Sequence, residues 1–254
     1  MPGETALSPL RFETTAAAEG ASYTSAERLA SGALLDRESG MLAGVSLGTA
    51  LSWRRWRFEL AASVLLGTID YEGQNQIGLP IATQTRLSHV ELGLHPIYRI
   101  GSTPFFIGPS FESRTIDRRI EPTLLTPGQH ETLNQRQLGL LWGARWESSF
   151  GLSAELRASV LWAFYSTLEV DFEGAFDNGT LSLPRSDAES AALEVSYVVV
   201  PRVSIAAEAK GETFRPAHSA SESLTKDGVR VGTYDYPGSV QDQWSVSLGV
   251  RTSF

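Results

Sequence analysis

The chain contains no cysteine, which excludes disulfide bonds, thiol nucleophiles and zinc sites built on thiolates. This composition fits a reducing compartment, or a family that avoids thiols in an oxidising one. Long apolar runs are also missing. No stretch of the 254 residues approaches the roughly 20 apolar residues that a membrane-spanning helix needs, and the mean hydropathy is −0.10. The sequence therefore excludes a helical membrane protein.

Basic residues are in the minority, with 21 Lys and Arg against 29 Asp and Glu. A chain with a net charge of −8 has no basic stripe to neutralise phosphates, so we expect no nucleic-acid partner. Residues 1–6 have neither the basic nor the apolar region of a signal peptide. Either the protein is never exported, or Met1 begins a mature chain whose signal was removed. We favour the second interpretation because of the periodicity described next.

A period of two dominates the sequence and predicts β-strands with one apolar and one polar face. In residues 240–254 the even positions are mostly apolar, whereas the odd positions carry Ser, Gly, Gln and Arg. Residues 41–53 and 56–66 repeat the pattern on either side of Arg54-Arg55, which predicts a hairpin. Ten segments alternate in this way: 10–16, 41–53, 56–66, 89–98, 105–112, 137–146, 152–164, 190–199, 203–210 and 240–254.

The connections between these segments alternate in length. Short ones fall at 54–55, 101–103, 147–151 and 201–202, and long ones at about 19–40, 70–86, 114–134, 166–188 and 212–240. Ten strands with every second loop long are typical of a closed antiparallel transmembrane β-barrel, with short periplasmic turns and five long external loops. We expect one such barrel domain over residues 1–254.

A soluble β-sandwich or small-ligand barrel also alternates apolar and polar residues, but there the apolar face points inward. Here the charged residues share their face with Gly and Ser, and the other face carries more Trp and Phe than a small cavity accommodates. Aromatic residues also gather at the short-turn ends, as in an interfacial girdle: Trp53, Trp56, Tyr98, Phe105, Trp146 and Phe150. These features favour the membrane barrel.

The last strand, 246–254, alternates apolar residues and ends on Phe254. It resembles the C-terminal signature of Gram-negative outer-membrane proteins, and the strand pattern extends this likeness over nearly the whole chain. The resemblance implies export to the outer membrane and insertion by the barrel-assembly machinery, with Phe254 as an assembly signal. It also implies contact with outer-membrane lipid and lipopolysaccharide, and we expect a monomer.

Nine charged or titratable residues fall on the inward face in the periplasmic half: Arg11, Glu13, Arg57, Glu59, His95, Arg145, Glu155, Arg157 and Arg251. Opposite charges in a ten-strand lumen are expected to pair, because an unpaired buried charge is costly. Such a network either plugs the lumen or borders a narrow polar conduit, which small inward residues such as Gly44, Ser46 and Gly48 would favour. We therefore predict a barrel with a narrow, charge-filled lumen that is structural or passes only small solutes.

The ten-strand count is similar to that of the omptins, outer-membrane proteases that use acidic residues and an Asp–His pair on opposing walls of the external rim. The corresponding loops here offer Asp70, Glu72, Asp171 and Glu173. No histidine lies near Asp171 in the sequence, so a water-activating pair would lack its base. A rim hydrolase is thus an alternative, as is a surface adhesin or receptor using loop 212–240. We expect no cofactor and no metal site.

Overall fold

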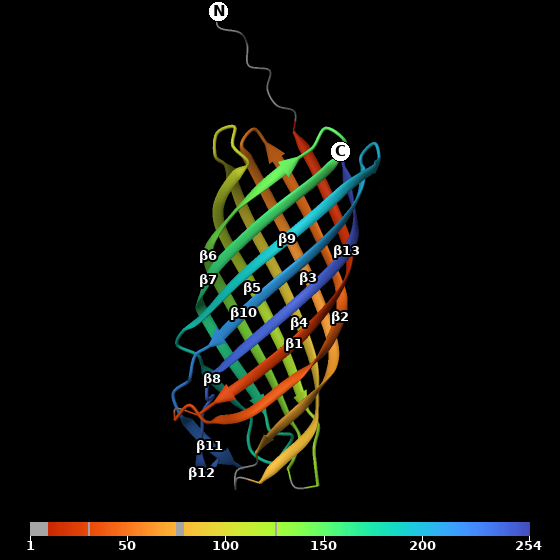
Figure 1. The fold of residues 1–254 in the computed structure, drawn as a ribbon. Helices are drawn as coiled ribbons and strands as arrows, with labels where there is room; N and C mark the ends of the chain where they lie inside the picture. Colours follow the sequence, from red (N-terminus) through yellow and green to blue (C-terminus); the bar gives the residue numbers. More distant parts are fainter. Residues whose placement is uncertain (1–9, 30, 75–78, 125) are drawn as a thin grey trace, which may run out of the picture.

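The computed structural model describes residues 10–29, 31–74, 79–124 and 126–254. Ten long antiparallel strands form the body of the molecule (Figure 1). They are β1 (Arg11–Arg28), β2 (Leu34–Trp53), β3 (Trp56–Gln74), β4 (Pro80–Arg99), β5 (Phe105–Ile120), β6 (Gln129–Glu147), β7 (Leu152–Asp171), β9 (Ser186–Val200), β10 (Val203–Pro216) and β13 (Ser239–Ser253). The predicted all-β class and strand number are confirmed.

The sheet closes on itself, because β1 pairs with β13 from Glu13 opposite Ser253 to Glu27 opposite Ser239. Around the wall the order is β1 to β7, then β9, β10, β13 and β1 again. Closure leaves no long edge strand unpaired in this part of the chain. The start of β1 and the end of β13 lie at the end of the barrel that carries the short turns (Figure 1).

Residues with positive φ make the short turns tight. The two-residue β2–β3 turn has Arg54 at φ 58°, and the β9–β10 turn has Arg202 at φ 71°. Two-residue hairpin turns need this left-handed conformation to match the strand twist. The predicted turn positions are therefore correct, although arginine stands where glycine or asparagine is commoner.

The external connections are shorter than the sequence indicates. The strands leave only residues 29–33, 75–79, 121–128, 172–185 and 217–238 between them. The last two of these connections contain further strands: β8 (Gly179–Ser182), which pairs with β7, and the hairpin of β11 (Glu222–Lys226) and β12 (Val229–Tyr234). The strands extend beyond the membrane, where the outward face becomes polar and the alternation of apolar and polar residues ends.

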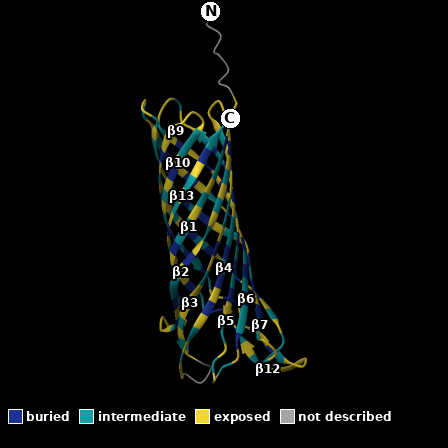
Figure 2. Cartoon of the chain, turned by 90° about the vertical axis from the view of Figure 1, so that its right-hand side faces the viewer, coloured by how far each residue is buried: buried dark blue, intermediate teal, exposed yellow. Residues whose placement is uncertain are grey.

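Exposure follows the predicted parity around the barrel (Figure 2). Outward Leu47, Leu60 and Leu248 are more than half exposed, whereas inward Glu13 and Glu59 are buried. The outward apolar residues form a band, bounded at the periplasmic end by Trp53, Trp56, Phe105 and Trp146, and externally by Met41, Leu66, Phe164 and Trp244. An outward apolar band between aromatic rows is the arrangement of a lipid-facing barrel surface. We call the parts of the strands inside this band, such as 41–53 of β2 and 56–66 of β3, the membrane-spanning segments.

Candidate functional site

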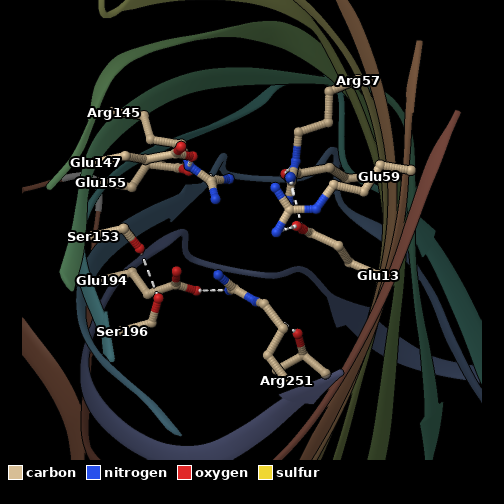
Figure 3. Close-up of polar contacts among 12 residues, drawn as sticks. Glu13, Arg57, Glu59, Arg145, Glu147, Ser153, Glu155, Glu194, Ser196 and Arg251 are labelled. Carbon is tan, nitrogen blue, oxygen red and sulfur yellow. Dashed lines mark hydrogen bonds and ion pairs between the residues drawn. The ribbon is translucent and has the colours of Figure 1, made fainter. Parts of the chain in front are cut away.

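The periplasmic half of the lumen holds a network of ion pairs (Figure 3). Arg57 on β3 lies 2.8 Å from Glu13 on β1 and 2.5 Å from Glu59. Arg157 on β7 reaches Glu59 at 3.1 Å and also pairs with Glu155. Since β3 and β7 are four strands apart around the wall, the Arg157–Glu59 pair crosses the lumen.

The other predicted lumen residues lie around this core. Arg145 approaches Glu155 at 3.6 Å, and Arg11, half exposed at the mouth, pairs with Glu13 at 3.1 Å. Arg251 pairs with Glu194 on β9. Glu194 is not among the nine lumen residues predicted from the sequence. His95 contacts the hydroxyl of Ser110 at 3.0 Å. The structure thus gathers all nine residues inside the periplasmic half; we name this group, together with Glu194, the periplasmic layer.

Above the periplasmic layer lies a polar cavity of about 200 Å³. Small residues of the wall, including Ser46, Gly48, Gly93 and Ser247, border it, and Glu91 and Lys210 line it as well. A volume of this size suits a few water molecules. The small residues that favoured a conduit therefore surround a local cavity.

A second charged layer, which the sequence analysis missed, lies beyond the cavity. Arg114 on β5 is 3.2 Å from Glu91 on β4 and also pairs with Glu212 on β10. Lys210 completes the ring, at 2.9 Å from Glu212 and 3.4 Å from Glu91. We call these four residues the middle layer. Arg114 is 2% exposed, and its contact with Glu212 joins opposite walls of the barrel.

Apolar side chains fill the next level of the lumen. Leu65 and Ile69 of β3, Leu87 of β4, Ile116 of β5 and Leu133 of β6 all have inward parity and are buried together. Ile116 stands between Arg114 and Arg118 on one face of β5, so this apolar layer separates two charged ones.

The external layer is built around Arg118. Its Nη1 lies 2.9 Å from Glu27 and 2.8 Å from Glu131, and its Nε lies 3.1 Å from Glu38. A fourth carboxylate, Asp36, stands opposite Glu27 in the β1–β2 register. One guanidinium group therefore faces four carboxyl groups from β1, β2 and β6, and all four of these residues are buried.

Burying four carboxyl groups beside one guanidinium group shifts the pKa values of the carboxyl groups. The external layer lies beyond the membrane-spanning segments: Glu38 precedes Met41, and Glu131 precedes Leu138. Burial raises the pKa of Glu27 to about 8, although Arg118 acts in the opposite direction, and Asp36 raises it further. Burial likewise raises the pKa of Glu131 to about 7 against the effect of Arg118. Desolvation is the dominant cause in both cases.

The middle and external layers escaped the sequence analysis because their residues lie in or beside segments assigned to loops. Arg114 and Arg118 begin the interval 114–134, and Glu27 and Glu38 lie within 19–40. The signal that would have found them is parity. Glu112, Arg114, Ile116 and Arg118 continue the inward face of β5 without interruption.

The four acidic residues of the alternative rim site do not converge. Asp70 and Glu72 share the outward parity of Leu66 on β3 and are exposed. Asp171 accepts a hydrogen bond from the Glu173 amide at 2.9 Å, and Glu173 pairs with Arg119 at 3.0 Å. Among the described residues, no contact joins the β3 pair to the β7 pair.

The three aromatic residues of the interval 212–240, where an adhesin or receptor surface was the alternative, are used for packing. Phe214 and Tyr236 are buried, and Tyr234 packs edge-on against Phe172 with ring centroids 5.6 Å apart. Phe254 makes backbone hydrogen bonds with Phe12 at 2.9 and 3.3 Å, which ties the last residue to the first strand.

Comparison with known proteins gives a fold. Neither the models of known protein families nor the curated proteins match the sequence. Among solved structures, the outer membrane protease OmpT from Escherichia coli matches with a TM-score of 0.57 at 11% identity, covering 99% of both chains. Neisserial surface protein A matches with a TM-score of 0.42 at 13% identity, covering 96% of this chain and 97% of that chain. OprG from Pseudomonas aeruginosa matches with a TM-score of 0.38 at 10% identity, covering 96% and 95%.

The chain is an outer-membrane-type β-barrel. Its closed ten-strand sheet and its outward apolar band place it in the cell outer membrane, as the sequence predicted. No helix in the described ranges is long and apolar enough to cross a membrane. The described residues also contain no cluster of three or more His, Asp or Glu side chains arranged to hold a metal ion.

Proposed function

We propose that this outer-membrane barrel is closed, with a lumen whose charged layers exclude solutes and carry no steady ion current. The observation that carries the proposal is the position of Arg114 and Arg118, two nearly inaccessible side chains that each bind carboxylates from distant strands. Each bridge spans the lumen between strands that are four positions apart around the wall. With the apolar layer between them, they form barriers in series along the axis.

Ion pairs are suited to such a seal because they hold each other in place. Removing one partner from a buried pair leaves an uncompensated charge, at a cost of about 3–5 kcal/mol. In the intact middle layer each cation pairs with both carboxylates, so every charge of the four has a partner of opposite sign. A solute would have to break these contacts before passing.

Conductance in planar bilayers tests the proposal. We expect the parent barrel to show no steady conductance. We expect the variant R57S/R157S to stay silent too, because it empties part of the periplasmic layer while leaving the middle and external layers intact. The variant R54S/R99S, which removes two arginines at the same end of the barrel, is the matched control. Steady conductance by the parent would overturn the closed-barrel proposal.

Proteolysis is the activity named for OmpT, but at 11% identity that similarity extends to the fold alone. The outward direction of Asp70 and Glu72 gives a rim hydrolase no common site with Asp171 and Glu173. We therefore do not transfer the protease activity to this chain.

A further inference from the structure

A pocket of about 510 Å³ opens at the external mouth of the barrel. Its walls come from the ends of β3, β4, β5 and β6 and from the segment that follows β7. Apolar groups dominate the lining, notably Ile81, Ile120, Pro127, Phe172 and Phe176. The two phenylalanine rings meet edge-on with centroids 5.6 Å apart. A concave site of this size, with an apolar wall and polar groups at fixed positions in the same lining, is typical of small-molecule binding.

The external layer lies directly beneath this pocket. On β5 the lining residue Ile120 is one inward position beyond Arg118, and on β6 Gln129 is one inward position before Glu131. Two lining side chains also donate hydrogen bonds to the layer: Gln129 to Glu131 at 2.5 Å, and the Tyr71 hydroxyl to Asp36 at 3.4 Å. A ligand in the pocket would therefore interact electrostatically with the charges of the external layer.

That charge is negative. The external layer contributes four carboxyl groups and the Arg118 guanidinium. The mouth also holds two ion pairs, Arg86–Glu121 at 2.8 Å and Arg119–Glu173 at 3.0 Å. Glu27 and Glu131 keep their protons up to about pH 8 and about pH 7, so the six carboxyl groups exceed the three guanidinium groups by about one charge just below pH 7 and by about three above pH 8. An excess of this kind attracts cations, most strongly where apolar walls exclude water.

Unused hydrogen-bond acceptors point in the same direction. Among the described residues, Oδ1 of Asp36, a residue only 7% exposed, receives no hydrogen bond from an amide or hydroxyl group, while Oδ2 receives Tyr71 and the Glu27 carboxyl approaches the same side chain. Oγ1 of Thr126, in the pocket lining, is likewise buried without a partner. Buried polar atoms are normally satisfied, so a ligand able to donate hydrogen bonds or carry positive charge fits this site.

From these observations we infer that the external pocket binds a small organic cation with an apolar body. The cationic group lies toward Tyr71, Asp36 and Glu121, and the apolar body lies against Ile81, Phe172 and Phe176. The aromatic faces add cation–π attraction. The inference is independent of whether the lumen conducts, because the pocket lies outside the proposed barriers.

Calorimetric titration of the full chain in lipid nanodiscs tests this inference with benzyltrimethylammonium as the probe. Benzyl alcohol and phenylacetate carry the same ring with no charge and with a negative charge. We expect saturable binding of the cation, affinity for benzyl alcohol about tenfold or more lower, and no binding of phenylacetate. Raising the salt concentration should weaken cation binding through screening.

Three variants locate the binding. F172A/F176A should lower cation affinity about fivefold or more, whereas F164A, which removes an outward lipid-facing ring, should leave it unchanged. E121Q should also weaken binding, and E72Q, at an exposed outward position, should not. I81W fills the pocket without removing any aromatic residue or charge, and should abolish binding while heat-modifiable migration on gels confirms a folded barrel. Equal binding of the three probes, no binding of the cation, or cation binding unaffected by I81W would each overturn the inference.

Discussion

At the scale of single residues, a missing side chain matters where two strands approach closely. A Cβ on Gly44 would lie 1.7 Å from the carbonyl oxygen of Val64 on the neighbouring strand. The same holds for two other glycines. A Cβ on Gly139 would lie 1.9 Å from the Val160 carbonyl oxygen, and one on Gly108 would lie 2.0 Å from the Pro96 carbonyl oxygen. These lumen glycines are therefore required by backbone packing, which gives Gly44 a role different from lining a conduit.

Replacing Gly44 by alanine should lower the free energy of unfolding by about 1–3 kcal/mol, because the strands must shift to admit a methyl group. Gly20 is the matched control: it also lies in a strand, and a Cβ there would meet nothing within 4 Å. Urea unfolding of G44A and G20A in lipid vesicles measures both effects. Equal midpoints for the two variants would contradict this explanation.

At the scale of elements, the β11–β12 hairpin is the largest addition to the barrel. It extends from the external end of the barrel, opposite the short turns (Figure 1). Asp177 fixes its turn by accepting hydrogen bonds from the Asp227 and Gly228 amides at 3.1 and 2.9 Å. Lys226 donates to the Gly174 carbonyl at 2.5 Å, and the Asp177 amide donates to Thr225. The hairpin is therefore held by the segment that follows β7.

The contact of Asp177 with the hairpin should depend on pH in the acid range. The hydrogen bond from the Gly228 amide lowers the pKa of Asp177 below the ordinary 3.8, because it stabilises the carboxylate. The stabilisation is present above pH 3.8 and is lost as the pH falls through the lowered pKa. The Gly228 amide resonance, followed by NMR, should therefore titrate with a midpoint below 3.8. In D177N, trypsin should cut after Lys226 faster at neutral pH than in the parent; unchanged cleavage would show that other contacts hold the hairpin.

At the scale of the whole molecule, the lumen is organised in strata. Ion pairs occupy the membrane-spanning part, an apolar layer follows, and the acid-rich external layer lies above the membrane. The external layer joins β1, β2, β5 and β6 through Arg118. Protonation of its carboxyl groups therefore changes the contacts that hold these four strands together at the external mouth. The barrel is thus sensitive to pH at one end.

Stability should fall as the pH rises from about 4.5 to about 8. Glu27 and Glu131 have folded pKa values raised to about 8 and about 7 from 4.5, so over this interval the folded state keeps protons that the unfolded state has released. The titratable and charged groups facing them are Tyr23 on β1, Asp36 and Glu38 on β2, Tyr71 on β3, Arg118 on β5 and Tyr236 before β13. Because the carboxyl groups share Arg118, they titrate as a coupled set.

Urea midpoints measured between pH 5 and pH 9 test this dependence, which E27Q/E131Q should flatten. The variant E169Q/E189Q is the control, since both of its positions are exposed on the barrel exterior. A parent whose stability is constant over this range would contradict the prediction.

The sequence by itself determined the fold class and the direction of the side chains. A period of two is a local property, so the ten strands, their tight turns and the inward parity of residues such as Glu13, Arg57 and Arg157 follow without knowledge of the fold. The sequence also indicated that the apolar face is the outer one, because Gly, Ser and the charged residues share the other.

Only the tertiary structure decided which charges meet and how far the strands extend. The pairs Glu59–Arg157, Arg114–Glu212 and Arg118–Glu27 join strands that are four positions apart around the wall. Their heights depend on the tilt and stagger with which the barrel closes, and no local pattern encodes these quantities. The external ends of the strands were missed for a related reason: outside the lipid, the outward face is polar and the alternation that marks a strand disappears, while the backbone pairing continues.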